Sequence, residues 1–364
     1  ADDEREYDVR KGGRTKFLSP GSLLAHFAGW RGKSGFGSSA TCDSVAEALE
    51  YDGRGRTAIV TGPYTGIGLS AARTLASRGC EVILAGRGGE EKGRGADWVE
   101  REITSKIAPM GERGGSVQAM ELDLSSLQSV KRFADEFKRT GKDLHLLVNN
   151  AGVMALPRFT RSKDGFELQW ATNHLGHFLL TKLLLPNMKR SANKPGAPQG
   201  RVINVASSAH YMSYPGEWIL KEQEMHSPTK YQPWRAYGQS KLSNVLHARE
   251  LNTRLQRERQ SEGGKGEVIA VAVHPGVIAT ELQRHIELPG WMRTAGRLAC
   301  SPFLKSIDQG AATTVYCCTA PSDQVRGGEF YADCNIQGSA PESKKRHLGE
   351  RLWDLSENHI KPFL

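Results

Sequence analysis

The sequence predicts an α/β fold built on a doubly wound parallel sheet of seven strands with helices on both faces. Short apolar stretches alternate with longer amphipathic ones along most of the chain, which is the order of strands and crossover helices in a parallel sheet. The first apolar stretch also runs directly into a glycine-rich turn. With 364 residues, 38% of them hydrophobic, the chain can bury one large core and an appendage.

The elements are expected in a regular order. Residues 57–61 form the first strand, and the glycine turn leads from it into a helix over residues 66–77. Residues 86–95 and 191–200 are expected to be solvated connections. Further strands are expected at residues 81–85, 117–122, 144–149, 201–205, 268–273 and 329–332, and further helices around residues 129–138, 167–189, 234–257 and 309–319.

Residues 1–55 are expected to form an extension ahead of the main domain, which spans residues 56–364. The extension is rich in glycine and cations and holds one short apolar patch at residues 23–27. Such a composition favours a mobile segment unless the core or a partner holds it. Because the sequence starts at Ala1 rather than at a methionine, we expect a trimmed or processed product.

A second unusual segment, residues 279–305, mixes apolar side chains with Pro289 and Gly290 beyond the carboxyl end of a strand. In an α/β fold this is the place of a lid over a ligand crevice. An extra pair of helices packed on the sheet fits the same pattern equally well.

Composition narrows the function. The formal net charge is +9, but cations and acids are interleaved and no helix or aromatic platform for reading nucleic acid is recognisable, so we expect no nucleic-acid partner. Six cysteines without paired metal spacing favour a reducing compartment. No apolar run reaches the roughly 18 residues of a membrane span, so the protein is expected to be soluble or peripheral. The histidines His174, His177 and His210 lack a further ligand and are assigned to packing, so no metal is expected.

The glycine-rich turn predicts a phosphate site of the Rossmann type. Glycines let the backbone turn tightly and approach a pyrophosphate at the positive end of the next helix. The paired Pro63 and Tyr64 inside the turn are unusual and are expected to change how it sits on phosphates. The candidate binding residues in the turn are Gly62, Tyr64, Thr65, Gly66, Ile67 and Gly68.

Three later positions fit the rest of a dinucleotide. Arg87 follows the second strand, where an acidic residue would bind an unmodified ribose, so NADP(H) is favoured over NAD(H); a solvated arginine is the alternative. Asp123, after the third strand, is placed to accept a hydrogen bond from an adenine amino group or to cap the next helix. Close approach of a cofactor is also expected at the turns containing Asn150, Ala151 and Gly152, and Pro275, Gly276, Val277 and Thr280.

The catalytic candidates centre on Tyr237 and Lys241, which lie one helical turn apart. A lysine cation beside a phenol favours the phenolate and lowers the pKa of the tyrosine, so the phenol can exchange protons. An ordinary amphipathic helix would show the same spacing. A serine beyond the fifth strand faces the same crevice, with Ser208 the better candidate to bind a substrate oxygen and Ser207 the fallback.

Taken together these motifs resemble the classical short-chain dehydrogenase/reductases over roughly residues 55–355. Residues 171–185, 236–247 and 274–277 look like the branch of retinol dehydrogenases and WW-domain oxidoreductases, closest to plant and algal relatives of the short-chain dehydrogenase of the chloroplast inner-envelope protein translocon. The resemblance implies hydride transfer between NADPH/NADP+ and a lipophilic carbonyl or alcohol. It gives Tyr237 the role of acid/base, Lys241 a pKa-lowering and ribose-binding role, Ser208 that of orienting the substrate, and Asn173 that of anchoring a proton-relay water.

The same resemblance leaves a second reading open. The chain would then be an NADP(H)-binding accessory or redox-sensing subunit of a larger organellar assembly, held through the extension and turning over little substrate. It also implies an organelle, with the chloroplast favoured and the cytoplasm as the alternative, and peripheral association with a membrane.

Overall fold

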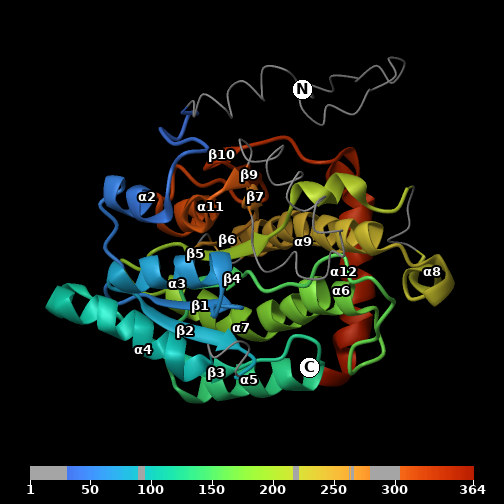
Figure 1. Ribbon diagram of the computed structural model, residues 1–364, viewed down its shortest axis with the longest axis horizontal. Coiled ribbons are helices and arrows are strands. Elements are labelled where there is room, and N and C mark those ends of the chain that lie inside the picture. Colours follow the sequence, from blue (N-terminus) through green and yellow to red (C-terminus); the bar gives the residue numbers. More distant parts are fainter. Residues whose placement is uncertain (1–30, 89–94, 216–220, 262, 264–265, 279–303) are drawn as a thin grey trace, which may run out of the picture.

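The computed structural model describes residues 31–88, 95–215, 221–261, 263, 266–278 and 304–364. Its central sheet is doubly wound, as predicted, with strands in the order β10-β9-β6-β5-β4-β1-β2-β3 (Figure 1). The strands are β1 (Thr57–Thr61), β2 (Glu81–Gly86), β3 (Ser116–Glu121), β4 (Leu146–Asn149), β5 (Gly200–Val205), β6 (Val268–His274), β9 (Phe330–Ala332) and β10 (Asn335–Ile336).

The seven predicted strands are confirmed, and all of them run parallel. The eighth, β10, pairs antiparallel with β9 through a tight turn in which Asp333 and Cys334 have positive φ angles of 52° and 61°. At two residues, β10 is too short to give an alternating pattern. Because the chain winds outward from β1 in both directions, the switch point of the sheet lies between β1 and β4.

Helices cover both faces of the sheet (Figure 1). One apolar layer joins α2, α3, α4 and α11 to the sheet, and the other joins α5, α7, α9 and α12. The long helices are α2 (Cys42–Ala48), α3 (Gly66–Ser77), α4 (Ala96–Ile107), α5 (Leu127–Arg139), α7 (Gly176–Ala192), α9 (Pro233–Ser261), α11 (Ile307–Thr319) and α12 (Arg346–Ile360). Shorter turns are η2 (Ala108–Arg113), α6 (Leu168–Trp170), η3 (Ala171–Leu175), η4 (Ser208–Met212), α8 (Glu222–Met225), η6 (Pro228–Lys230), η9 (Pro341–Lys344) and η10 (Lys361–Phe363).

Part of the expected extension packs on the domain. Helix α2 buries Cys42, Val45 and Ala46 against α3 and α11. Arg73 of α3 ties the two neighbours together, since its Nη2 lies 3.0 Å from Asp308 Oδ1 on α11 and 3.7 Å from Asp43 Oδ2 on α2. The proposed division of the chain at residue 55 stays a prediction, and residues 1–30 lie outside the described residues.

The segment predicted as a lid lies largely outside the described residues, which resume at residue 304. Its two ends are described, because β7 (Val277–Ile278) pairs in parallel with β8 (Leu304–Lys305). The segment therefore leaves and returns at the same place beside the carboxyl end of β6. Among the described residues, no helix combines the length and apolar character needed to cross a bilayer.

Candidate active site

The glycine turn joins β1 to α3 at the switch point. Gly62 and Gly66 have positive φ angles of 63° and 57°, which favour glycine, and a Cβ added to Gly68 would lie 2.2 Å from the carbonyl oxygen of Gly62. Thr65, the N-cap residue of α3, makes no side-chain capping bond. The first N–H groups of the helix therefore receive no cap from Thr65, and the turn fits a pyrophosphate.

The predicted Asn150–Gly152 turn braces this site from the next strand. Thr61 Oγ1 accepts hydrogen bonds from the N–H groups of Asn150 (2.9 Å) and Ala151 (3.0 Å), and Asn150 Nδ2 donates to Thr61 O at 2.8 Å. A Cβ on Gly62 would lie 2.9 Å from Ala151 Cα. The two turns are consequently held against each other. The part that the Thr61 hydroxyl plays in this contact was not predicted from the sequence.

Asn173 lies in a π-helical turn, η3, within the predicted helix of residues 167–189. Its amide makes three bonds, because Oδ1 accepts from Val153 N (2.8 Å) while Nδ2 donates to Val153 O (2.9 Å) and to Ser240 Oγ (2.9 Å). The inserted residue of a π-turn is a recurrent feature of functional sites. Asn173 thereby ties the loop after β4 to the helix α9 that carries Tyr237.

Tyr237 and Lys241 are both buried on α9, with Lys241 Nζ 5.7 Å from the centre of the Tyr237 ring. Lys241 Nζ donates to Val205 O at 2.9 Å. Burial raises the pKa of Tyr237 to about 12 and lowers the pKa of Lys241 to about 8. In this structure, desolvation outweighs the expected lowering of the Tyr237 pKa by the lysine. The side chain that lowers the Tyr237 pKa is Ser207.

Of the two candidate serines, the structure places the side chain of Ser207 at Tyr237. The Ser207 side chain lies close enough to the Tyr237 phenol to lower its pKa, and the Ser207 oxygen accepts from Ala209 N at 3.1 Å at the start of η4. The hydrogen bond described for Ser208 is made by its backbone N–H, which donates to His274 Nδ1 at 3.2 Å. Ser207 is the N-cap residue of η4 and Ser208 is its first residue, so the side chain placed at Tyr237 is that of Ser207, and the choice of catalytic serine stays a prediction.

The other predicted positions fall along the same edge of the sheet. Asp123 accepts at Oδ1 from Ser125 N (3.0 Å) and at Oδ2 from Lys163 Nζ (2.8 Å), so it holds the turn before α5. Arg87 is exposed immediately after β2. The predicted residues Pro275, Gly276 and Val277 follow β6, with Gly276 at a φ of 87°, and Thr280 lies outside the described residues.

The three histidines considered as ligands each bond within the protein. His177 Nδ1 donates to Asn173 O (3.0 Å), so its Nε2 accepts from the Thr61 hydroxyl (2.8 Å), and burial lowers its pKa to about 4. His174 Nε2 lies 2.9 Å from Ser356 Oγ, and His210 Nε2 accepts from Ala340 N at 2.9 Å. Within the described residues, no group of three or more His, Cys, Asp or Glu side chains is arranged to hold a metal ion.

Sequence reasoning missed two residues that complete the site. Ser240, between the predicted tyrosine and lysine, binds Asn173, and Asn244 Nδ2 donates to Val205 O at 3.0 Å beside Lys241. Both lie on the same helix as Tyr237, at spacings of three and seven residues. That periodicity was the available signal.

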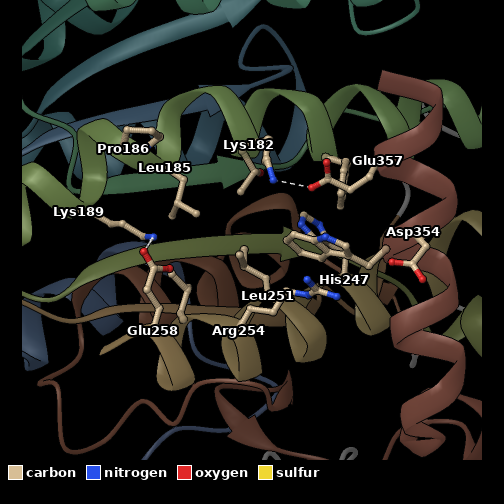
Figure 2. Close-up of a pocket in the computed structure, with 14 residues that line it drawn as sticks. Lys182, Leu185, Pro186, Lys189, His247, Leu251, Arg254, Glu258, Asp354 and Glu357 are labelled. Carbon is tan, nitrogen blue, oxygen red and sulfur yellow. Dashed lines mark hydrogen bonds and ion pairs between the residues drawn. The ribbon is translucent and has the colours of Figure 1, made fainter. Parts of the chain in front are cut away.

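A cavity of about 570 Å³ lies elsewhere, between α7, α9 and α12 (Figure 2). Its rim carries the ion pair between Lys182 Nζ and Glu357 Oε1 (2.5 Å), and Arg254 stacks 4.4 Å from the centre of the Trp353 ring. Tyr237, Lys241 and Asn173 are not among its lining residues. The cavity is therefore separate from the catalytic candidates at the carboxyl edge of the sheet.

A phosphate-type turn at the switch point, together with a buried tyrosine, lysine and serine beside it, defines an oxidoreductase with a Rossmann-type fold and a nicotinamide cofactor. The model of the short chain dehydrogenase family matches residues 56–219. The chain belongs to this family, in the branch that includes retinol dehydrogenases and TIC 32 proteins.

Three relatives illustrate the placement. Short-chain dehydrogenase TIC 32 A, chloroplastic, of Brassica napus is 41% identical over 329 residues, or 90% of this chain and 95% of the relative. Retinol dehydrogenase 12 of Homo sapiens is 38% identical over 302 residues, or 83% and 85%. A crystal structure of an uncharacterised protein from Mycobacterium Paratuberculosis aligns with a TM-score of 0.60 at 32% identity, covering 85% of this chain and 95% of that one.

Proposed function

We propose that this protein is an NADPH-dependent oxidoreductase that transfers a hydride between nicotinamide and a lipophilic carbonyl or alcohol. The observation that carries the proposal is the contact of the Ser207 hydroxyl with the Tyr237 phenol, next to the buried Lys241. These are the acid, the cation and the oxygen-binding group that carbonyl reduction requires.

In the reducing direction, Ser207 and Tyr237 both donate hydrogen bonds to the substrate oxygen. The bound nicotinamide supplies the hydride. As negative charge develops on the oxygen, Tyr237 gives up its proton, and the ammonium of Lys241 stabilises the resulting phenolate. With a pKa of about 8, Lys241 still carries its proton at pH 7. In the oxidising direction the phenolate takes the proton back from the alcohol.

Two features support the cofactor and substrate class. Arg87 follows β2, where a guanidinium suits a 2′-phosphate. Retinol, named in the relative retinol dehydrogenase 12, is a lipophilic alcohol. We extend that class to this chain, with the site residues Tyr237, Lys241, Ser207 and Asn173 acting on it.

The test is NADPH oxidation by the purified protein against a panel of retinoid, steroid and long-chain aliphatic carbonyls. Tyr237→Phe is the matched control, because it removes only the hydroxyl group from a buried ring. We expect turnover with at least one lipophilic carbonyl and its loss in the variant. Turnover that the variant leaves unchanged would refute the mechanism, and binding of neither dinucleotide would refute the function.

A second candidate is favoured by the 41% identity to a chloroplastic TIC 32 protein and by the docking of α2 on the domain. In it, the chain is an NADP(H)-binding subunit of a chloroplast assembly at the membrane surface, joined through the N-terminal region. Native electrophoresis of solubilised organelles tests it. Migration in a large complex that is lost on deleting residues 1–30 supports this function, and migration as a monomer or dimer refutes it.

A further inference from the structure

Tyr64 occupies an unusual position in the glycine turn. A Cβ built on Gly86, at the end of β2, would lie 2.7 Å from Tyr64 Cε2 and 3.3 Å from both Cδ2 and Cζ. The phenol oxygen lies 3.4 Å from Leu84 O. The ring of Tyr64 is therefore wedged over the end of β2, in the space that a side chain at residue 86 would take.

That space matters for the choice of dinucleotide. In a Rossmann-type site, an acidic side chain about 20 residues beyond the glycine turn binds the ribose hydroxyls of NAD(H). Gly86 stands at this place, at the end of the second strand. A side chain there would need the Tyr64 ring to shift, since a Cβ at 2.7 Å from Cε2 is closer than real Cβ contacts.

Binding of a 2′-phosphate does not require an acidic side chain at residue 86. Its partner is the guanidinium of Arg87, one residue further on and exposed. Glycine at 86 leaves the backbone open beside the ring. The pair of Tyr64 and Gly86 is consistent with NADP(H) and obstructs the recognition of NAD(H).

We infer that Tyr64 bars an NAD(H)-selecting carboxylate from residue 86, because its ring fills the space over Gly86, and so keeps this end of the site suited to the 2′-phosphate of NADP(H). The inference rests on the proposed function and deepens it. Tyr64 is here a residue that bars one mode of binding by steric exclusion, so its effect depends on what stands at residue 86.

A double-mutant cycle tests this dependence, with Gly86→Asp, Tyr64→Asn and the combined variant titrated separately with NADPH and NADH by protein fluorescence. Asparagine is chosen because it is small and common in turns. We expect the wild-type protein to bind NADPH at least about tenfold more tightly than NADH, a difference of about 1.4 kcal/mol. We expect Gly86→Asp to lose NADPH binding without gaining NADH, and the combined variant to bind NADH at least about tenfold more tightly than either single variant.

Tyr64→Phe is the matched control. The 3.4 Å distance from its hydroxyl to Leu84 O is too long for a strong hydrogen bond, so the ring alone should preserve the preference for NADPH. Loss of the preference in Tyr64→Phe would contradict steric exclusion and point to the hydroxyl instead.

Several outcomes overturn the inference. One is a gain in NADH affinity in Gly86→Asp as large as that in the combined variant, because the ring would then have moved aside. If thermal unfolding shows that Gly86→Asp does not fold, the comparison of the combined variant with Tyr64→Asn decides, and equal NADH affinities overturn the inference. Wild-type protein that binds neither dinucleotide refutes both the inference and the proposed function. Additive effects of the two substitutions on NADH affinity refute only the role of Tyr64.

Discussion

The two ends of the candidate active site are built in different ways. At the catalytic end, polar groups hold one another in place, since Asn173 makes three hydrogen bonds and Lys241 donates to Val205 O. At the end of β2, the ring of Tyr64 fills the space over Gly86, with Arg87 exposed beside it. In the proposed function, the first end fixes the geometry of proton transfer, and the second end sets which dinucleotide fits by leaving or closing space.

The contrast has a consequence for substitutions. A buried polar network loses the bond that is removed and also leaves its other members unsatisfied. A steric contact changes only the shape that a ligand meets. Substitutions at the catalytic end should therefore lower the rate, and substitutions at the end of β2 should change affinity for one dinucleotide against the other.

The largest expected effect separates the two neighbouring serines. Ser207→Ala removes the hydroxyl placed beside Tyr237, so we expect the rate constant for carbonyl reduction to fall about 10²- to 10³-fold with little change in cofactor affinity. Ser208→Ala is the matched control and should stay within about threefold of the wild-type rate, a difference below about 1 kcal/mol. Steady-state kinetics on both variants checks this, and the opposite order would restore Ser208 as the catalytic serine.

Asn173→Ala should come next, because it breaks three bonds at once and strands the Val153 backbone and the Ser240 hydroxyl. We expect a loss of about 2–4 kcal/mol in the free energy of unfolding, measured in urea, together with a lower rate. Ser240→Ala breaks only one of these bonds and should cost about 1 kcal/mol. Equal losses in the two variants would show that Asn173 is not the centre of the network.

At the end of β2 the expected effect is on affinity alone. Arg87→Ala should weaken NADPH binding about tenfold and leave NADH binding unchanged, because the proposed ligand of the guanidinium is the 2′-phosphate, which NADH lacks. Arg87→Lys retains the charge but not the planar guanidinium, so its affinity for NADPH should lie between those of wild type and Arg87→Ala. Titration of each variant with both dinucleotides measures this, and an equal loss for NADPH and NADH would place Arg87 away from the 2′-phosphate.

The same contrast explains what the sequence could predict. The glycine turn, α3 and all seven parallel strands were predicted within about two residues, because apolar period and turn chemistry are local properties. Helix α2 was missed, since it is short, stands after a glycine-rich stretch and is identified only by its burial against α3 and α11. The nicotinamide cofactor class follows from motifs that the chain shares with its family.

The details that decide the chemistry depended on contacts between distant segments. Which of two adjacent serines meets Tyr237 depends on where η4 begins, and this is a matter of one residue. The contact of Tyr64 with Gly86 joins residues 22 apart that no periodicity connects. Burial, which reverses the expected shift in the Tyr237 pKa, is likewise a property of the packed molecule.

The remaining expected effect is on stability alone and concerns the support of the catalytic end. Glu167 is buried and caps α6, the turn that leads into the π-helical η3 with Asn173; its oxygens accept from Gln169 N (2.9 Å) and Trp170 N (2.7 Å). Burial, only partly offset by these bonds, raises the pKa of Glu167 from 4.5 to about 7. The folded state then binds this proton more tightly than the unfolded state does, so the contribution of Glu167 to stability falls as pH rises from about 4.5 to 7.

Glu167→Gln removes that titration while keeping the shape of the side chain. We expect the free energy of unfolding of the variant, relative to wild type, to increase by as much as about 3 kcal/mol between pH 4.5 and 7 and to level off above. A constant cost is expected at every pH, because the substitution replaces one of the two accepting oxygens with an NH2 group, which then faces an N–H donor. Urea unfolding at a series of pH values separates the pH-dependent difference from the constant cost. A difference between variant and wild type that does not change with pH would mean that Glu167 titrates near its ordinary pKa, and that the catalytic end is held without a titratable support.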